Sequence, residues 1–187
     1  MKTGKIVRQF VAKDEHNVIL RTPKWEDLDD LLEFINSLVD ESADIGKSKK
    51  ATRQEEADWL GRLLANLEND RLFALVAEVD GKVIANSELS QKSGYSGHVG
   101  EIGIAIRAGY RDIGIGTEML RTLISHAREI GLKVLRLSVF SSNPRAKHVY
   151  EKMGFRETGR IPKEIFKDGK YIDEILMTME TQITFIK

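Results

Sequence analysis

The stretch from residue 104 to residue 120 reads IAIRAGYRDIGIGTEML, and it predicts a strand, a glycine-containing turn and then a helix. Residues 100–106 are apolar with small residues between them, as in a buried strand. Gly131 stands where the residue that follows a helix C-cap is expected. After Gly116 the apolar positions have the three-and-four spacing of one helix face: Met119, Leu120, Leu123, Ile124, Ala127 and Ile130.

The turn has the pattern Arg111-x-x-Gly114-x-Gly116. Its glycines allow a sharp bend and bring a ligand close to backbone amides. The first N–H groups of a helix lack intrahelical partners and carry partial positive charge, so this arrangement suits a phosphate or diphosphate. The spacing is not the Rossmann fingerprint, and no Gly-Lys-Ser/Thr follows as in a P-loop. Glycines also begin helices for purely steric reasons, so this stretch alone leaves both interpretations open.

A second stretch favours the anion-site interpretation; it spans residues 143–155 and reads NPRAKHVYEKMGF. Together the two stretches resemble the GNAT superfamily of N-acetyltransferases. The diphosphate loop of that family has the form Q/R-x-x-G-x-G/A, which residues 111–116 satisfy at every fixed position. Its later helix commonly reads N-x-x-A-x-x-x-Y-E-K-x-G-F, matched here by Asn143, Ala146, Tyr150, Glu151, Lys152, Gly154 and Phe155. The resemblance is strong over residues 72–179 and weak before them.

The expected fold is α/β, with a mixed, mostly antiparallel central sheet and flanking helices. We expect a single domain over residues 1–187, with core motifs at 72–179, a strand extension at 1–21 and a tail at 180–187. Strands are predicted at 5–12, 17–21, 72–79, 82–90, 98–107, 134–140, 155–166 (interrupted at 159–162) and 171–179, with an Asp80-Gly81 hairpin turn between the third and the fourth. Helices are predicted to begin at Pro23 with Thr22 as the cap, at Thr52 with Thr52 and Glu55 as a capping box, at Gly114 and at Asn143. Parallel pairing is expected across the helix 114–130 crossover. In the family, two strands splay apart there and leave a slot for the pantetheine arm.

The resemblance implies acetyl-CoA as donor and a primary amine as acceptor, the amine attacking the thioester directly in a ternary complex. The backbone of Ile113–Thr117, assisted by Arg111 and the Thr117 hydroxyl, would hold the diphosphate. Main-chain contacts from strand residues 104–106 would hold the pantetheine. The complete set of predicted donor-binding residues is Ile104, Ala105, Ile106, Arg111, Asp112, Ile113, Gly114, Ile115, Gly116, Thr117, Asn143 and Tyr150.

Three of these residues, and two acids, need individual comment. Asp112 stands where the family often has glycine, and a carboxylate beside a diphosphate is unfavourable unless it points away. Asn143 precedes Pro144 and is suited to cap a helix, which we favour as its main role. Tyr150 is the candidate general acid because a phenol with a pKa of about 10 is protonated at neutral pH; packing alone is the competing interpretation. Glu101 is the candidate base, although a surface salt bridge is nearly as good an explanation, and Glu88 is a second candidate.

Composition excludes several other chemistries. The 29 basic and 29 acidic residues cancel, which argues against a nucleic-acid partner. There is no cysteine, and the 4 histidines show no ligand spacing, so no metal is expected. No long apolar run follows the first residues, so we expect a cytoplasmic protein without a membrane contact.

The acceptor side is less defined. The acceptor is a small amine, polyamine, amino acid or protein N-terminus, chosen by the first two helices, their loop and the hairpin 162–171. The acids of these segments favour either a cationic acceptor or, more simply, solvated helix faces: Asp27, Asp29, Asp30, Glu33, Asp40, Glu41, Asp44, Glu55 and Glu56. Because dimers are common in the family, a homodimer is also an expectation. The alternative function is a non-catalytic acyl-CoA-binding sensor.

Overall fold

A computed structural model describes residues 1–181, and residues 182–187 of the predicted tail lie outside the described part. Contacts divide the chain into two compact units, one of Met1–Ser90 with Gly103–Met119 and one of Gln91–Ile102 with the chain from Leu120 onward. Strand β5 (Val99–Ile106) and helix α3 (Ile115–Glu129) contribute residues to both units. Each unit is described in turn.

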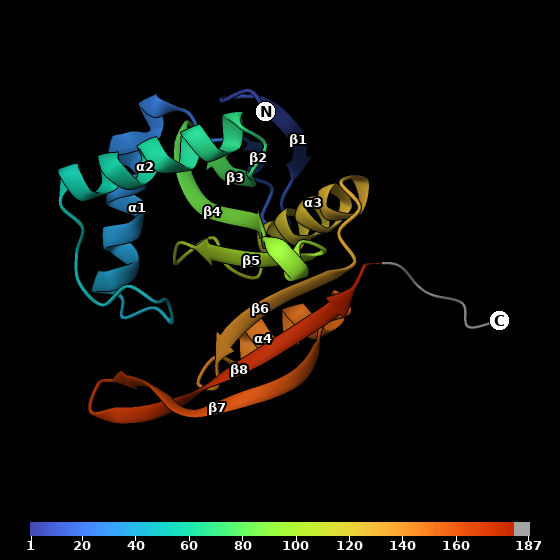
Figure 1. Ribbon diagram of the computed structural model, residues 1–187. Coiled ribbons are helices and arrows are strands. Elements are labelled where there is room, and N and C mark those ends of the chain that lie inside the picture. The colour runs from blue at the N-terminus through green and yellow to red at the C-terminus, as the bar shows by residue number, and fades with distance from the viewer. Residues whose placement is uncertain (182–187) are drawn as a thin grey trace. The chain divides into compact units, whose positions relative to one another are not determined.

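The first unit is an antiparallel meander covered by two helices (Figure 1). Strands β1 (Ile6–Val11), β2 (Asn17–Arg21), β3 (Leu72–Val79) and β4 (Lys82–Gln91) pair in chain order, and β5 follows β4. Helices α1 (Leu28–Asp40) and α2 (Arg53–Glu68) bury their apolar faces against this sheet. The shared core consists of Leu28, Leu31, Phe34, Leu38, Leu60, Leu63, Ala74, Val76 and Val83.

The second unit contains the parallel pair. The start of β5 pairs in parallel with β6 (Val134–Phe140), β8 (Lys170–Glu180) pairs antiparallel with β6, and β7 (Arg156–Lys167) pairs antiparallel with β8. Helix α4 (Pro144–Lys152) joins β6 to β7. The strand order β1-β2-β3-β4-β5-β6-β8-β7 confirms the mixed, mostly antiparallel sheet and the parallel pair at the crossover.

Several local predictions are confirmed at the level of single hydrogen bonds. Asp80 and Gly81 both have positive φ (49° and 76°), as the predicted β3–β4 hairpin turn requires. The Thr52 hydroxyl accepts a bond from the Glu55 N–H (3.2 Å), and the Glu55 carboxylate accepts one from the Thr52 N–H (2.8 Å), so the predicted capping box opens α2. In β7 the predicted interruption appears as two register irregularities, after Glu157 and after Ile161, within one continuous strand.

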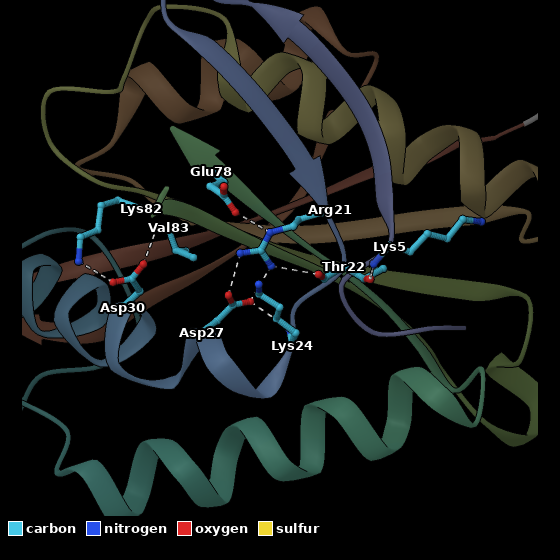
Figure 2. Close-up of polar contacts among 9 residues, drawn as sticks. All are labelled: Lys5, Arg21, Thr22, Lys24, Asp27, Asp30, Glu78, Lys82 and Val83. Atoms are coloured by element: carbon cyan, nitrogen blue, oxygen red, sulfur yellow. Dashed lines mark hydrogen bonds and ion pairs between the residues drawn. The ribbon is translucent and has the colours of Figure 1, made fainter. Parts of the chain in front are cut away.

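The prediction that Thr22 caps a helix beginning at Pro23 is wrong. The Thr22 hydroxyl donates to the Lys2 carbonyl (2.8 Å) and accepts from the Lys5 N–H (2.8 Å), so it anchors the N-terminal segment instead. A short 3₁₀ turn, η1 (Trp25–Asp27), precedes α1. The Asp27 carboxylate accepts the Lys24 N–H at 2.9 Å and so supports that turn (Figure 2).

A buried ionic cluster joins β2, η1 and β3 (Figure 2). The Arg21 guanidinium donates two bonds to the Asp27 carboxylate, both 2.7 Å, and its Nε donates to Glu78 at 2.7 Å. The Arg21 and Asp27 side chains are only 7% and 4% exposed. Burial lowers the pKa of Arg21, but the hydrogen bonds that it donates to Asp27 and Glu78 outweigh this effect and raise the pKa overall. Since neither charge is solvated, the cluster fixes where α1 begins relative to the sheet.

Candidate active site

The loop between β5 and α3 has the geometry of an anion site. Asp112 and Gly114 have positive φ (67° and 99°), which turns the chain sharply before α3 begins at Ile115. The first helical bond runs from the Glu118 N–H to the Gly114 carbonyl at 3.1 Å. The amides of Ile115, Gly116 and Thr117 therefore precede the helical ladder at the positive end of the helix dipole. Such amides suit a diphosphate, as the sequence predicts.

Gly116 allows the helix start to approach β5 closely. A Cβ atom at this position would lie 2.8 Å from the Ile106 Cδ1 atom and 3.9 Å from the Ile104 Cδ1 atom. The two isoleucine side chains therefore pack beneath the first turn of α3. The backbone of Ile113 is held as well, because its carbonyl accepts the Lys13 N–H at 3.0 Å. The loop conformation is thus fixed by packing and by a bond from the β1–β2 turn.

The end of β5 exposes one backbone edge. The Arg107 N–H donates to the Ile84 carbonyl of β4 at 2.9 Å, so the Ile106 carbonyl, on the same peptide unit, points away from β4. Ile104 has the same parity as Ile106 and presents its backbone polar groups on that side too. The β5–β6 ladder runs only from Val99↔Val134 to Glu101↔Arg136, although β5 continues to Ile106 and β6 to Phe140. This arrangement suits the predicted main-chain contacts of Ile104 and Ile106 with a pantetheine arm.

Arg111 does not point freely from the loop. Its Nε donates to the Ile106 carbonyl at 2.8 Å, and its terminal nitrogen is paired with the Glu41 carboxylate at the end of α1. The Arg111 side chain is 34% exposed. The sequence predicts Arg111 as a donor that assists the loop, but it does not show this partner, because Glu41 lies 70 residues earlier.

Asn143 caps α4, and Tyr150 on this helix is a buried side chain. The Asn143 side chain accepts the Ala146 N–H at 3.0 Å, which confirms the predicted helix cap. Tyr150 is buried, with 8% of its surface exposed, and packs edge-on against Phe155 with ring centroids 6.2 Å apart. Burial raises the pKa of Tyr150 to about 12. The phenol is therefore fully protonated at neutral pH, as a general acid must be.

The two candidate bases have different surroundings. Glu101 lies opposite Arg136 in the β5–β6 ladder and is paired with it at 2.5 Å, and its side chain is 47% exposed. This is the surface salt bridge that the sequence offered as the alternative. Glu88 lies on β4 opposite Ala74, a residue of the α1–α2 core. Burial raises the pKa of Glu88, and a hydrogen bond from Asn86 only partly opposes that shift.

Most of the acids on α1 and directly beside it have basic partners. The pairs are Asp27–Arg21, Asp29–Arg53, Asp30–Lys82, Glu33–Arg107, Asp40–Lys50 and Glu41–Arg111. Glu55 serves the capping box. Glu56 differs, because it is 5% exposed and burial raises its pKa, with Lys47 opposing the shift. The pairing favours solvated, internally compensated helix faces over a site for a cationic acceptor.

The described residues show neither a cluster of metal ligands nor a membrane-spanning helix. Over residues 1–181, no three His, Asp or Glu side chains gather closely enough to hold a metal ion. In the same part of the chain, no helix is both long and apolar enough to cross a membrane.

Comparison with known proteins identifies the family. The model of the Acetyltransferase (GNAT) family matches residues 29–155. The chain belongs to this family. The match spans the predicted diphosphate loop and the helix containing Tyr150, and it confirms the resemblance drawn from residues 111–116 and 143–155.

Individual GNAT relatives match over about half of the chain. An uncharacterised N-acetyltransferase of Methanocaldococcus jannaschii is 37% identical over 103 residues, which are 54% of this chain and 62% of that protein. An L-amino acid N-acetyltransferase of Escherichia coli is 29% identical over 105 residues, 55% of this chain and 65% of the relative. The matched part thus spans less than two thirds of each relative's length.

Solved structures share the fold. A GNAT phosphinothricin acetyltransferase from Sinorhizobium meliloti, in complex with acetyl-CoA, superimposes with a TM-score of 0.77. Its sequence is 20% identical, and the superposition covers 87% of this chain and 88% of that one. At this identity the likeness shows the fold.

Sequence reasoning did not find the partners of the site residues. Glu41 was noted only as one of many acids, and nothing in the local sequence links it to Arg111. Glu88 was ranked below Glu101 because the burial of a strand position depends on which helices cover it. The alternation in NSELS places Glu88 on the strand face opposite Leu89, so the local sequence gave no sign that Glu88 would be partly buried.

Proposed function

We propose that this chain is an acetyl-CoA-dependent N-acetyltransferase that acetylates a primary amine by direct attack in a ternary complex. The observation that carries the proposal is the start of α3, where the amides of Ile115, Gly116 and Thr117 follow the left-handed residues Asp112 and Gly114. A diphosphate accepts hydrogen bonds from such amides without any specific side chain. Family membership supports acetyl-CoA as the ligand that brings this diphosphate.

The reaction needs two proton transfers. The amine nitrogen attacks the thioester carbonyl carbon, the carbon–sulfur bond breaks, the amine loses a proton and the departing thiolate gains one. We assign the second transfer to Tyr150, whose phenol remains protonated because burial raises its pKa to about 12. Position in the matched helix motif supports this assignment.

For the first transfer we favour Glu88 over Glu101. A general base works best when its pKa approaches the working pH, and burial moves the pKa of Glu88 upward in that direction. The charge of Glu101 is already compensated by its ion pair with Arg136 on the protein surface. Glu101 as the base stays a prediction, and the comparison of Glu88→Gln with Glu101→Gln tests it.

The acceptor we propose is the α-amino group of a free amino acid or of a closely related small molecule. The E. coli relative named as an L-amino acid N-acetyltransferase supports this class. A polyamine is disfavoured because the acids of α1 are paired with the chain's own lysines and arginines.

The experiment is a panel assay of CoA release with acetyl-CoA and each of the standard amino acids, a polyamine and a short peptide. We expect turnover with at least one α-amino acid and the mass of its N-acetyl product. Binding of acetyl-CoA without turnover of any amine would instead support the sensor alternative. Comparing the thermal shift produced by CoA with that of pantetheine, which lacks the diphosphate, tests the loop directly; equal shifts would refute it.

The base is assigned by comparing Glu88→Gln with Glu101→Gln. We expect Glu88→Gln to abolish the fall of the rate at acid pH along with most of the activity, while CoA affinity is retained. If Glu101→Gln does so and Glu88→Gln does not, the assignment reverses.

A further inference from the structure

Two of the three guanidinium nitrogens of Arg111 have partners within the protein. Its Nε donates to the Ile106 carbonyl at 2.8 Å, and its terminal nitrogen pairs with the Glu41 carboxylate. The Ile106 carbonyl is one of the backbone groups that face away from β4, where the proposed donor arm would bind. Arg111 is thus held against two groups of the protein at the place where a diphosphate is proposed to arrive.

The position of Glu41 is not explained by the stability of its helix. Helix α1 ends at Asp40, with Glu41 as its C-cap at the negative end of the helix dipole, and has no basic residue in its last turn. Carboxylates there are unfavourable unless cations compensate them. Lys50 pairs with Asp40 at 2.8 Å, and Arg111 pairs with Glu41. Only the second of these cations comes from the donor loop.

The segment that follows Glu41 is anchored at both ends. The N–H of Glu41 donates to the Ser37 carbonyl at 3.1 Å, and the Ser42 N–H donates to the Val39 carbonyl at 3.0 Å, which closes the helix end. At the other end, the Asn36 side-chain amide bonds both backbone groups of Ala51, at 2.7 and 3.1 Å. The Glu41–Arg111 pair therefore connects the segment between α1 and α2 to the loop between β5 and α3.

We propose that Glu41 competes with the donor diphosphate for Arg111, so that Glu41 lowers donor affinity and is released when the donor binds. Both phosphates of the donor accept charge-assisted bonds in the same fork geometry that a carboxylate uses, so one guanidinium edge cannot serve both. The Arg111 side chain is 34% exposed and is therefore accessible to the ligand. The inference rests on the proposed donor loop and adds Glu41 as a positioning residue that acts through Arg111.

The test is a set of CoA dissociation constants measured by calorimetry at one ionic strength. Glu41→Gln frees Arg111 and should tighten CoA binding by about two- to fivefold, the range for a partly exposed ion pair. Asp40→Asn is the matched control, because it removes the same charge from the same helix end without touching Arg111, and it should leave affinity unchanged. In an Arg111→Gln background the effect of Glu41→Gln should vanish.

Hydrogen exchange gives a second readout that affinity alone does not. Residues 42–50 should exchange faster in the wild type when CoA is added, and faster in Glu41→Gln without CoA, because the tether to Arg111 is lost in both cases. The inference is overturned if Glu41→Gln binds CoA no more tightly than Asp40→Asn, or if its gain persists without Arg111. Failure of the wild type to bind CoA at all would refute the donor loop instead.

Discussion

Replacing Tyr150 with Phe separates the chemistry of the phenol from its packing. The ring contact with Phe155 is kept, while the hydroxyl, in a side chain that is 8% exposed, is lost. If the phenol protonates the thiolate, turnover should fall about 10²- to 10⁴-fold with little change in CoA affinity. Tyr95→Phe is the control, because Tyr95 is fully exposed on a surface turn and should leave turnover unchanged.

The same substitution has an effect on stability whose sign follows from the pKa. Burial raises the pKa of Tyr150 from 10.0 to about 12, so the folded state retains a proton that the unfolded state loses above pH 10. The wild type is therefore fully stabilised below pH 10 and loses this contribution, on the order of 3 kcal/mol, as the pH rises toward 12.

Urea unfolding between pH 8 and pH 12 measures that loss. Tyr150→Phe should lack it, so the free energies of unfolding of variant and wild type should converge or cross at high pH. Wild-type turnover in the variant would remove Tyr150 from the mechanism. An identical alkaline loss in both proteins would show that the phenol is not the buried group that titrates.

Three further substitutions test other parts of the site. Burial raises the pKa of Glu88 above its ordinary 4.5, so the folded protein loses stability as the pH rises through the raised value. Urea unfolding of Glu88→Gln from pH 4 to 8 should lack this loss. An unchanged pH profile of the unfolding free energy would contradict the burial argument. Asp27→Ala leaves Arg21 buried without its main partner and should cost about 3–5 kcal/mol of unfolding free energy; a loss below 1 kcal/mol would show that water replaces the carboxylate. Asn143→Ala removes the bond to the Ala146 N–H and should cost about 1 kcal/mol, with wild-type stability contradicting the capping role.

Features that depend on neighbouring residues were predictable from the sequence. The Asp80-Gly81 turn, the Thr52–Glu55 capping box and the start of α3 all follow from backbone preferences within four residues. Thr22 shows the limit of such reasoning. Threonine before Pro23 is a good cap in isolation, but here its hydroxyl is taken by Lys2 and Lys5, which lie 20 and 17 residues away.

The ion pairs of the acids on and beside α1 were not predictable either, because their partners also lie far away in the sequence. Nothing local to α1 shows that Glu33 pairs with Arg107 or that Glu41 pairs with Arg111, because both arginines follow β5. A run of acids on two helices therefore left both a cationic acceptor and solvated helix faces open. In the folded chain the acids around α1 are largely compensated, whereas burial raises the pKa of Glu56 and of Glu88.

The turn into α3 was predictable because the proposed donor loop would bind through its backbone, and this also accounts for the departure at Asp112. Asp112 has a φ of 67°, a left-handed conformation that glycine adopts freely and that aspartate tolerates better than most residues. The backbone turn that aims the amides of Ile115 to Thr117 is therefore preserved without glycine at position 112. A site built from amides requires only that the chain bend correctly, whereas a site built from side chains requires particular partners from distant segments. This difference explains why the α3 start was identified from the sequence while the partners of Arg111 and the burial of Glu88 were not.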